Sequence, residues 1–151
     1  MVEVAELGHS SDSGRAVEHV VPNDVWQIWR QVRLLLEARP ESWSSYYTIQ
    51  ALFRAVQNGE IQLWAVRAGG ALELVVFTEI RDFPKLRVLD VLLCIGRHLA
   101  PSVEFMEDVE RYARRRGAKK VVGMGREGFL RVLAKRNYRQ CVVGFEKNLE
   151  N

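Results

Sequence analysis

Residues 86–122 read LRVLDVLLCIGRHLAPSVEFMEDVERYARRRGAKKVV, and this stretch decides the fold. Its first part, LRVLDVLLCIG, is an almost continuous apolar run, which predicts a central strand buried on both faces. A loop through Pro101 and Ser102 leads into an amphipathic helix that Gly117 ends. KKVV then starts another strand. A strand, a crossover helix and a second strand predict a parallel pair inside an α/β domain.

The rest of the chain supplies the other elements of this domain. AVEHVV predicts a strand that Pro22 ends, and two amphipathic helices follow, the second capped by Ser44 or Ser45. IQLWAVRAGGALELVVFTEI reads as a hairpin with a Gly-Gly turn. After the crossover, REGFLRVLAKRNY predicts a short helix, and RQCVVGFEKNL predicts a last strand. We therefore expect an α/β fold with a mixed sheet flanked by helices, in the order β-α-α-β-β-β-α-β-α-β.

The 151 residues are enough for one domain with a proper core. Residues 1–14 are polar and rich in Gly and Ser, so we expect a flexible arm before a single domain at 15–151. There is no apolar run long enough for a membrane span and no signal-peptide pattern. Cys94 and Cys141 stand alone in apolar runs, which favours buried thiols in a reducing compartment. These features predict a cytoplasmic protein and leave its oligomeric state open.

The net charge of +3 is small, but the basic residues crowd into RYARRRGAKK. This cluster is either the cationic end of a helix or a nucleic-acid patch, and the absence of interleaved aromatic residues favours the first interpretation. Nucleic acid therefore stays a weak candidate partner. His9, His19 and His98 are too far apart in the sequence to predict a metal site.

The element order resembles that of the GNAT superfamily of acyl-CoA N-acyltransferases. The resemblance rests on RVLDVLLCIG and the helix ending in YARRRGAKKVV, on the hairpin LWAVRAGGALELVVFTEI, and on GFLRVLAKRNYRQCVVGFEKNL. Within the superfamily, TEIRDFPKLRVLDVLL and GMGREGFLRVL are similar to small GNAT-like proteins encoded by tailed phages. The resemblance implies acetyl-CoA, or another acyl-CoA, as the cofactor and an amine as the acyl acceptor.

The resemblance places the family's cofactor motif on residues 97–102, where glycine backbone and a helix N-terminus bind a pyrophosphate. Arg97 matches the motif and His98 adds a second attractive group, but Ala100 replaces the first glycine of the motif and Ser102 replaces the second. Pro101 removes an N–H donor, and Glu104 adds a negative charge. The implied cofactor-binding residues are Leu93, Cys94 and Ile95 on the strand, with Arg97, His98, Ala100 and Ser102 in the loop.

Two carboxylates are candidates for the general base of such a transfer. Asp90 interrupts the apolar run RVLDVLL, and Glu79 lies at the end of the preceding strand. A buried Asp needs a partner or a raised pKa, so Asp90 is either a base or half of a structural pair with Arg81 or Arg87. The tyrosine acid that many family members carry falls on Leu133 in this chain.

Two functions therefore follow from the sequence. The first is an acetyl-CoA-dependent N-acetyltransferase with a degenerate cofactor loop. The second is a catalytically silent virion protein of a phage, from the internal head, the ejection apparatus or the tail, which acts through protein or nucleic-acid contacts. Such a protein would be packaged in the particle, with virion proteins as its partners. Nothing in ARPESWSSYY or RDFPK specifies the amine acceptor.

Overall fold

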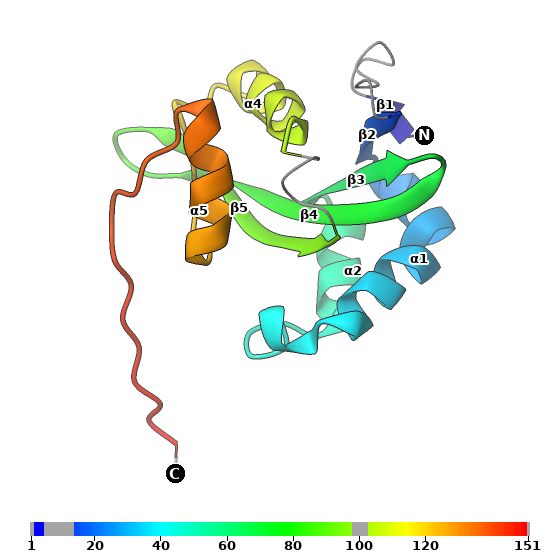
Figure 1. The fold of residues 1–151 in the computed structure, drawn as a ribbon, viewed down its shortest axis with the longest axis horizontal. Coiled ribbons are helices and arrows are strands. Elements are labelled where there is room, and N and C mark those ends of the chain that lie inside the picture. The colour runs from blue at the N-terminus through cyan, green and yellow to red at the C-terminus, as the bar shows by residue number, and fades with distance from the viewer. Residues whose placement is uncertain (1, 5–13, 98–102, 151) are drawn as a thin grey trace.

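A mixed sheet forms the centre of the domain in the computed structural model, which describes residues 2–4, 14–97 and 103–150 (Figure 1). Within these residues the sheet has six strands in the order β1-β2-β3-β4-β5-β6. All neighbouring pairs are antiparallel except β5 and β6, which are parallel, as the crossover predicts. The strands are β1 (Val2–Val4), β2 (Arg15–Val20), β3 (Gln62–Ala68), β4 (Ala71–Asp82), β5 (Arg87–Gly96) and β6 (Lys120–Gly123).

Helices cover both faces of the sheet, as Figure 1 shows. One face packs against α1 and α2, and the other against α4 and α5. The α-helices are α1 (Val25–Ala38), α2 (Ile49–Gln57), α4 (Phe105–Arg115) and α5 (Glu127–Leu133). Short 3-10 turns are found at η2 (Pro22–Asp24), η3 (Pro40–Ser42) and η4 (Ala134–Arg136).

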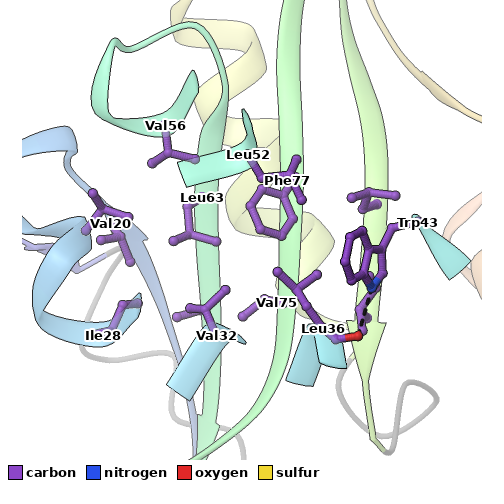
Figure 2. Close-up of a cluster of buried hydrophobic side chains, with 14 residues drawn as sticks. Val20, Ile28, Val32, Leu36, Trp43, Leu52, Val56, Leu63, Val75 and Phe77 are labelled. Carbon is purple, nitrogen blue, oxygen red and sulfur yellow. Dashed lines mark hydrogen bonds between the residues drawn. The ribbon is translucent and has the colours of Figure 1, made fainter. Parts of the chain in front are cut away.

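The α1/α2 face holds a dense apolar cluster (Figure 2). Leu36 and Leu52 from the helices meet Leu63 and Phe77 from the strands, and all four are completely buried. Trp43 closes one end of this cluster, and its indole N–H donates to the Leu36 carbonyl oxygen at 2.8 Å. The buried ring therefore keeps its one polar group satisfied.

The α4/α5 face is built around Trp64. Its indole N–H donates to the Thr78 hydroxyl at 3.0 Å, and its ring stacks on His19 with 4.5 Å between centroids. Tyr112 from α4 meets both rings edge-on. This aromatic group packs α4 against β2 and β3.

The predicted fold class is confirmed, and the predicted order holds through α5. Three local predictions differ from the structure. Thr48, and not Ser44 or Ser45, caps α2, and its hydroxyl accepts from the Ala51 N–H at 3.1 Å. Val2–Val4 add an edge strand that the polar arm did not predict. The rest of the arm, at residues 5–13, lies outside the described residues.

The third difference is the last strand. RQCVVGFEKNL was expected to join the sheet, but after a left-handed turn at Asn137 the chain forms no helix or strand up to residue 150. We call residues 137–150 the C-terminal segment. Tyr138 packs against the α4/α5 core, whereas Val142, Val143, Phe145 and Leu149 are solvent-exposed. In the described part of the chain, no helix is long and apolar enough to cross a bilayer.

Candidate functional site

A β-bulge at Leu92 organises the candidate site. Thr78 of β4 pairs with Val91, but the next β4 residue, Phe77, pairs with Leu93, so Leu92 is the extra residue. Before the bulge, Leu89 packs on the α4/α5 face; after it, Leu93 packs on the α1/α2 face. A bulge re-aims side chains and bends the strand, which is why bulges are common beside active sites. The sequence LDVLLC does not predict this bulge.

Glu79 and Asp90 are direct cross-strand neighbours just before this bulge. Opposed residues of an antiparallel pair share one face with Cβ atoms about 5 Å apart, so the two carboxylates form a like-charge pair. Arg81 donates from Nη1 to the Asp90 carboxylate at 3.1 Å and offsets part of this repulsion. Of the two predicted partners for Asp90, the structure selects Arg81, because Arg87 pairs with Asp82.

Glu79 differs from Asp90 in having no such partner. Across the described ranges, no hydrogen bond or ion pair engages its half-buried carboxylate. A half-buried carboxylate with no hydrogen-bond partner can accept a proton from a group placed beside it. The structure therefore brings the two predicted catalytic residues together and distinguishes their surroundings.

Tyr47 completes this group, and the sequence did not identify it as a site residue. It precedes α2, packs against the α1/α2 cluster and is half-buried. Burial raises the pKa of its hydroxyl first, and the charges of Glu79 and Asp90 raise it further, while Arg81 lowers it. The hydroxyl thus stays protonated beside the carboxylates and can donate a hydrogen bond. The position of Tyr47 beside the carboxylates depends on the turns before α2, which the sequence pattern does not show.

The second half of the site is the opening between β5 and β6. β6 pairs with β5 only along residues 88–91, and it ends at Gly123. Beyond Val91, the edge of β5 that faces β6 has no strand partner among the described residues. Leu93, Cys94 and Ile95, the predicted cofactor-binding residues of the strand, lie along this edge. Unpaired backbone N–H and C=O groups here can bind an amide-containing chain as an added strand would.

The end of β5 is shaped by Gly96. Its φ is +152°, and a Cβ at this position would lie 2.1 Å from the Glu73 carbonyl oxygen. Only glycine therefore allows β5 to pass so close to β4. The Arg97 N–H then donates to that same carbonyl at 2.8 Å, and the Arg97 side chain is exposed at the end of β5.

The predicted phosphate loop is described only at its two ends. His98, Ala100 and Ser102 lie outside the described residues, so their predicted roles stay predictions. On the far side, α4 begins at Phe105 with Glu104 at its N-cap position, and Glu107 and Asp108 occupy the first turn. These acids offset the partial positive charge of the helix N-terminus, which opposes phosphate binding there.

Two further groups define the chemistry of the site. Burial raises the pKa of the Cys94 thiol to about 12, so it is neutral near pH 7 and is not a nucleophile. Leu133, at the position of the family's tyrosine acid, is buried in the α4/α5 core. Tyr138 packs against the α4/α5 core, and its hydroxyl donates to Glu110 at 2.7 Å. No group of three or more metal-ligating side chains occurs in the described ranges.

The fold of this chain, but not its sequence, is similar to that of known proteins. No family profile and no curated protein matches the sequence. The fold is similar to an aminoglycoside acetyltransferase from an uncultured soil metagenomic sample, solved with sisomicin, at 12% identity and a TM-score of 0.68 over 92% of this chain and 99% of that chain. It is also similar to a GCN5-related N-acetyltransferase from Ralstonia eutropha JMP134, at 14% identity and a TM-score of 0.65 over 91% of this chain and 100% of that one.

A third similar structure is a predicted acetyltransferase from Clostridium acetobutylicum, solved with acetyl-CoA. It shares 12% identity and has a TM-score of 0.62 over 89% of this chain and 96% of its own. The chain thus has the fold of the GNAT acetyltransferases over nearly its whole length. At these identities the likeness shows the fold, and the reaction is a separate question.

Proposed function

We propose that the chain is an N-acetyltransferase that binds acetyl-CoA, or another acyl-CoA, along the open edge of β5. The acceptor amine would enter from the α1/α2 face, where Glu79, Asp90 and Tyr47 converge. The observation that carries this proposal is the carboxylate of Glu79, which lies beside the bulge with no partner in the described ranges and opposite the ion-paired Asp90.

The residues of the opening fit a pantetheine arm better than a pyrophosphate. The unpaired edge at Leu93–Ile95 offers backbone groups that an amide chain can pair with, and such pairing does not depend on side chains. Arg97 supplies the cation for a phosphate, while the acidic first turn of α4 opposes it. Acetyl-CoA, when bound, would supply the thioester: the amine nitrogen would take the acetyl group as the C–S bond breaks, and CoA would leave as a thiolate that takes a proton from solvent. We therefore expect weak binding with most of the contact along β5.

The roles of the protein groups follow from their surroundings. Glu79 accepts the proton that the acceptor amine must lose, directly or through a water molecule. Asp90 is held by Arg81, so it contributes negative charge that attracts a cationic amine. Tyr47, which keeps its proton, donates a hydrogen bond to the acceptor. Cys94 is neutral, which favours direct transfer to the amine over a covalent acyl-enzyme at this residue.

The proposal is tested by incubating the protein with acetyl-CoA and amines and following the acetylated product by mass spectrometry. The amines are sisomicin, because it is bound by a protein of similar fold, and peptides with a free N-terminus or a lysine. Glu79→Gln should lower the rate by about 10²–10⁴-fold, which is typical of a lost general base. Glu37→Gln, on the exposed surface of α1, is the matched control and should leave the rate unchanged.

The catalytically silent alternative has its own supporting observation. The acid position holds the buried Leu133, and the N-terminus of α4 is acidic. A phage virion protein with this fold would transfer no acetyl group to any amine and would be found in purified particles. Acetylated product that disappears in Glu79→Gln would exclude this alternative. No product from any amine, together with detection in particles, would favour it.

A further inference from the structure

An open cleft of about 810 Å³ lies between the end of α4, β6, η4 and the start of the C-terminal segment. It shares no residue with the Glu79–Asp90 pair or with the open edge of β5, so it is a separate feature of the molecule. Basic side chains from each of these parts of the chain line it: Arg114, Lys119, Lys120, Lys135, Arg136 and Arg139.

The charge of this cleft exceeds the charge of the whole protein. Its six cations are accompanied by one carboxylate, Glu110, so the lining has a formal net charge of +5, against +3 for the chain. The residues outside the cleft are therefore net negative by two. A cleft lined by one sign of charge focuses the electric field and raises the local concentration of partners of the opposite sign.

Most of these cations have no counter-charge within the protein. Glu110 already binds Arg136 at 3.4 Å and accepts from the Tyr138 hydroxyl at 2.7 Å. In the part of the chain that the structure describes, no hydrogen bond or ion pair engages the side chains of the other five, which are all exposed: Arg114, Lys119, Lys120, Lys135 and Arg139. Gathered like charges repel one another, and an anion bound between them would relieve this repulsion.

The end of α4 explains only a small part of this cluster. A helix C-terminus carries the equivalent of about −0.5 elementary charge, which one or two cations offset. Arg114 and Arg115 already occupy the last turn of α4. Lys135, Arg136 and Arg139 come from beyond α5, and the fold brings them to the same cleft. The cationic helix end that RYARRRGAKK predicts therefore does not account for them.

The lining also restricts the kind of anion that fits. Protein interfaces have aromatic, apolar centres and few lysines, whereas three of the six cations here are lysines. Single-stranded nucleic acids stack their bases on exposed aromatic rings. Tyr138, the one aromatic residue of the described lining, is half-buried and bonded to Glu110. An RNA duplex is recognised in part through its 2′-hydroxyl groups, and beside the charged groups the lining offers mainly small apolar side chains and Asn137.

We infer that this cleft binds the phosphodiester backbone of double-stranded DNA, without reading its sequence. A DNA duplex carries about one negative charge per 1.7 Å of its axis, so several cations of the cleft can contact phosphates at once. Backbone contacts of this kind position a protein on the duplex and carry no sequence information. The binding does not rest on acetyl transfer, because the cleft and the candidate carboxylates share no residue.

Fluorescence anisotropy of the full chain with a short labelled DNA duplex of mixed sequence tests the inference. Near physiological salt, the dissociation constant should be on the order of 10⁻⁶–10⁻⁴ M. The logarithm of the binding constant should fall with the logarithm of the salt concentration with a slope of about −4.5, if each of the five exposed cations contacts one phosphate. No binding at low salt, or binding that does not depend on salt, would overturn the inference.

A variant of the cleft shows whether these cations make the contacts. Arg114→Gln, Lys135→Gln and Arg139→Gln are combined in one chain, because all three side chains are exposed and have no ion-pair partner in the described ranges. Binding should weaken by about tenfold or more, and the salt slope should become shallower by about 2.7. An unchanged Tm would show that the variant is folded. Unchanged affinity and slope in the folded variant would contradict the inference.

The matched control removes the same charge from another surface. It combines Arg30→Gln, Arg39→Gln and Arg54→Gln, which are exposed on the α1/α2 side of the domain. Its DNA affinity should stay within about twofold of wild type, and an equal loss would mean that net charge, and not the cleft, governs binding. A single strand, an RNA duplex or polyglutamate of the same total charge should each bind the wild type more weakly than the DNA duplex. Tighter binding of any of the three would contradict the assignment to double-stranded DNA.

Discussion

The two sides of β5 differ sharply in how completely they are packed. Toward β4, β5 is paired along its whole length, and the strands from β2 to β5 are covered by buried clusters on both faces. Toward β6, β5 is paired only along residues 88–91, and the C-terminal segment beyond β6 exposes its apolar side chains. The same kind of apolar alternation is found on both sides, so the sequence pattern alone does not decide which strands become buried.

This difference coincides with the candidate site. The fully paired side fixes Glu79 and Asp90, because their strands are held by the core on either side of them. The sparsely paired side leaves backbone groups of β5 open, which a bound chain can use. The proposed acetyl transfer uses both features, the fixed carboxylates for the acceptor amine and the open strand edge for the acyl donor.

The largest expected difference in stability is between variants of two phenylalanines, Phe77 on the packed side and Phe145 in the C-terminal segment. Phe77→Ala, in the packed side, should lower the free energy of unfolding by about 3–5 kcal/mol because it leaves a cavity in the core. Phe145→Ala, in the C-terminal segment, should change it by about 0.5 kcal/mol or less. Urea unfolding measures both values. Similar losses for the two variants would mean that the segment belongs to the core.

The two cysteines provide a second contrast. Burial raises the pKa of Cys94 to about 12, whereas Cys141 lies exposed in the C-terminal segment. Thiolate is the reactive form, so alkylation of Cys94 near neutral pH should be slower than that of an ordinary cysteine by about 10³-fold. Iodoacetamide labelling followed by peptide mass spectrometry should therefore modify Cys141 first. Equal labelling in the folded protein would show that the packed side opens readily.

Two glycines test how tightly β5 is held at the mouth of the site. Gly96→Ala places a methyl group against the Glu73 carbonyl oxygen and should cost about 2–4 kcal/mol, with loss of the end of the β4–β5 ladder. Gly69→Ala, in the β3–β4 turn with open space around it, should cost only the left-handed backbone penalty of about 1–2 kcal/mol. Thermal melting measures both losses, and Gly96→Ala should lower Tm more than Gly69→Ala. A smaller loss for Gly96→Ala would mean that β5 can move away from β4.

The smallest expected effect on stability is that of the ion pair between Arg87 and Asp82. Arg87 donates to the Asp82 carboxylate at 2.6 Å and to the Arg116 carbonyl oxygen at 2.8 Å, which links the β4–β5 turn to the end of α4. The hydrogen bond from Arg87 lowers the pKa of Asp82 below its ordinary value of 3.8. Its contribution is therefore present above pH 3.8 and is lost as the pH falls through the lowered value. Asp82→Asn should lower the urea midpoint slightly at pH 6, and the difference should shrink as the pH falls below 3.8.

Much of the fold was predictable because it depends on short-range patterns. The continuous run LRVLDVLLCIG gave the central strand, and the crossover to KKVV gave the one parallel pair. The bulge at Leu92 was not predictable, since it comes from how β4 and β5 match in length and twist. The cap of α2 was misplaced because Ser44, Ser45 and Thr48 offer the same chemistry, and only the folded chain selects Thr48.

The candidate site was predictable in part for the same reason. Asp90 stood out because it interrupts an apolar run, and Glu79 because it lies at the end of one, and strand pairing brings them together. Tyr47 was missed, because its position depends on the turns before α2. The predicted last strand failed because alternation in RQCVVGFEKNL shows that a strand partner is needed without saying where the partner lies.

The most direct test of the account is thermal melting with and without acetyl-CoA. A ligand that binds only the folded chain adds about 2.7 kcal/mol of stability at a hundredfold excess over Kd, so millimolar acetyl-CoA should raise Tm. Glu104→Gln should enlarge the shift, because it removes a negative charge from the N-terminus of α4 and tightens binding by about 0.3–1 kcal/mol. An unchanged Tm at millimolar acetyl-CoA would contradict the proposal that the open edge of β5 is an acyl-CoA site.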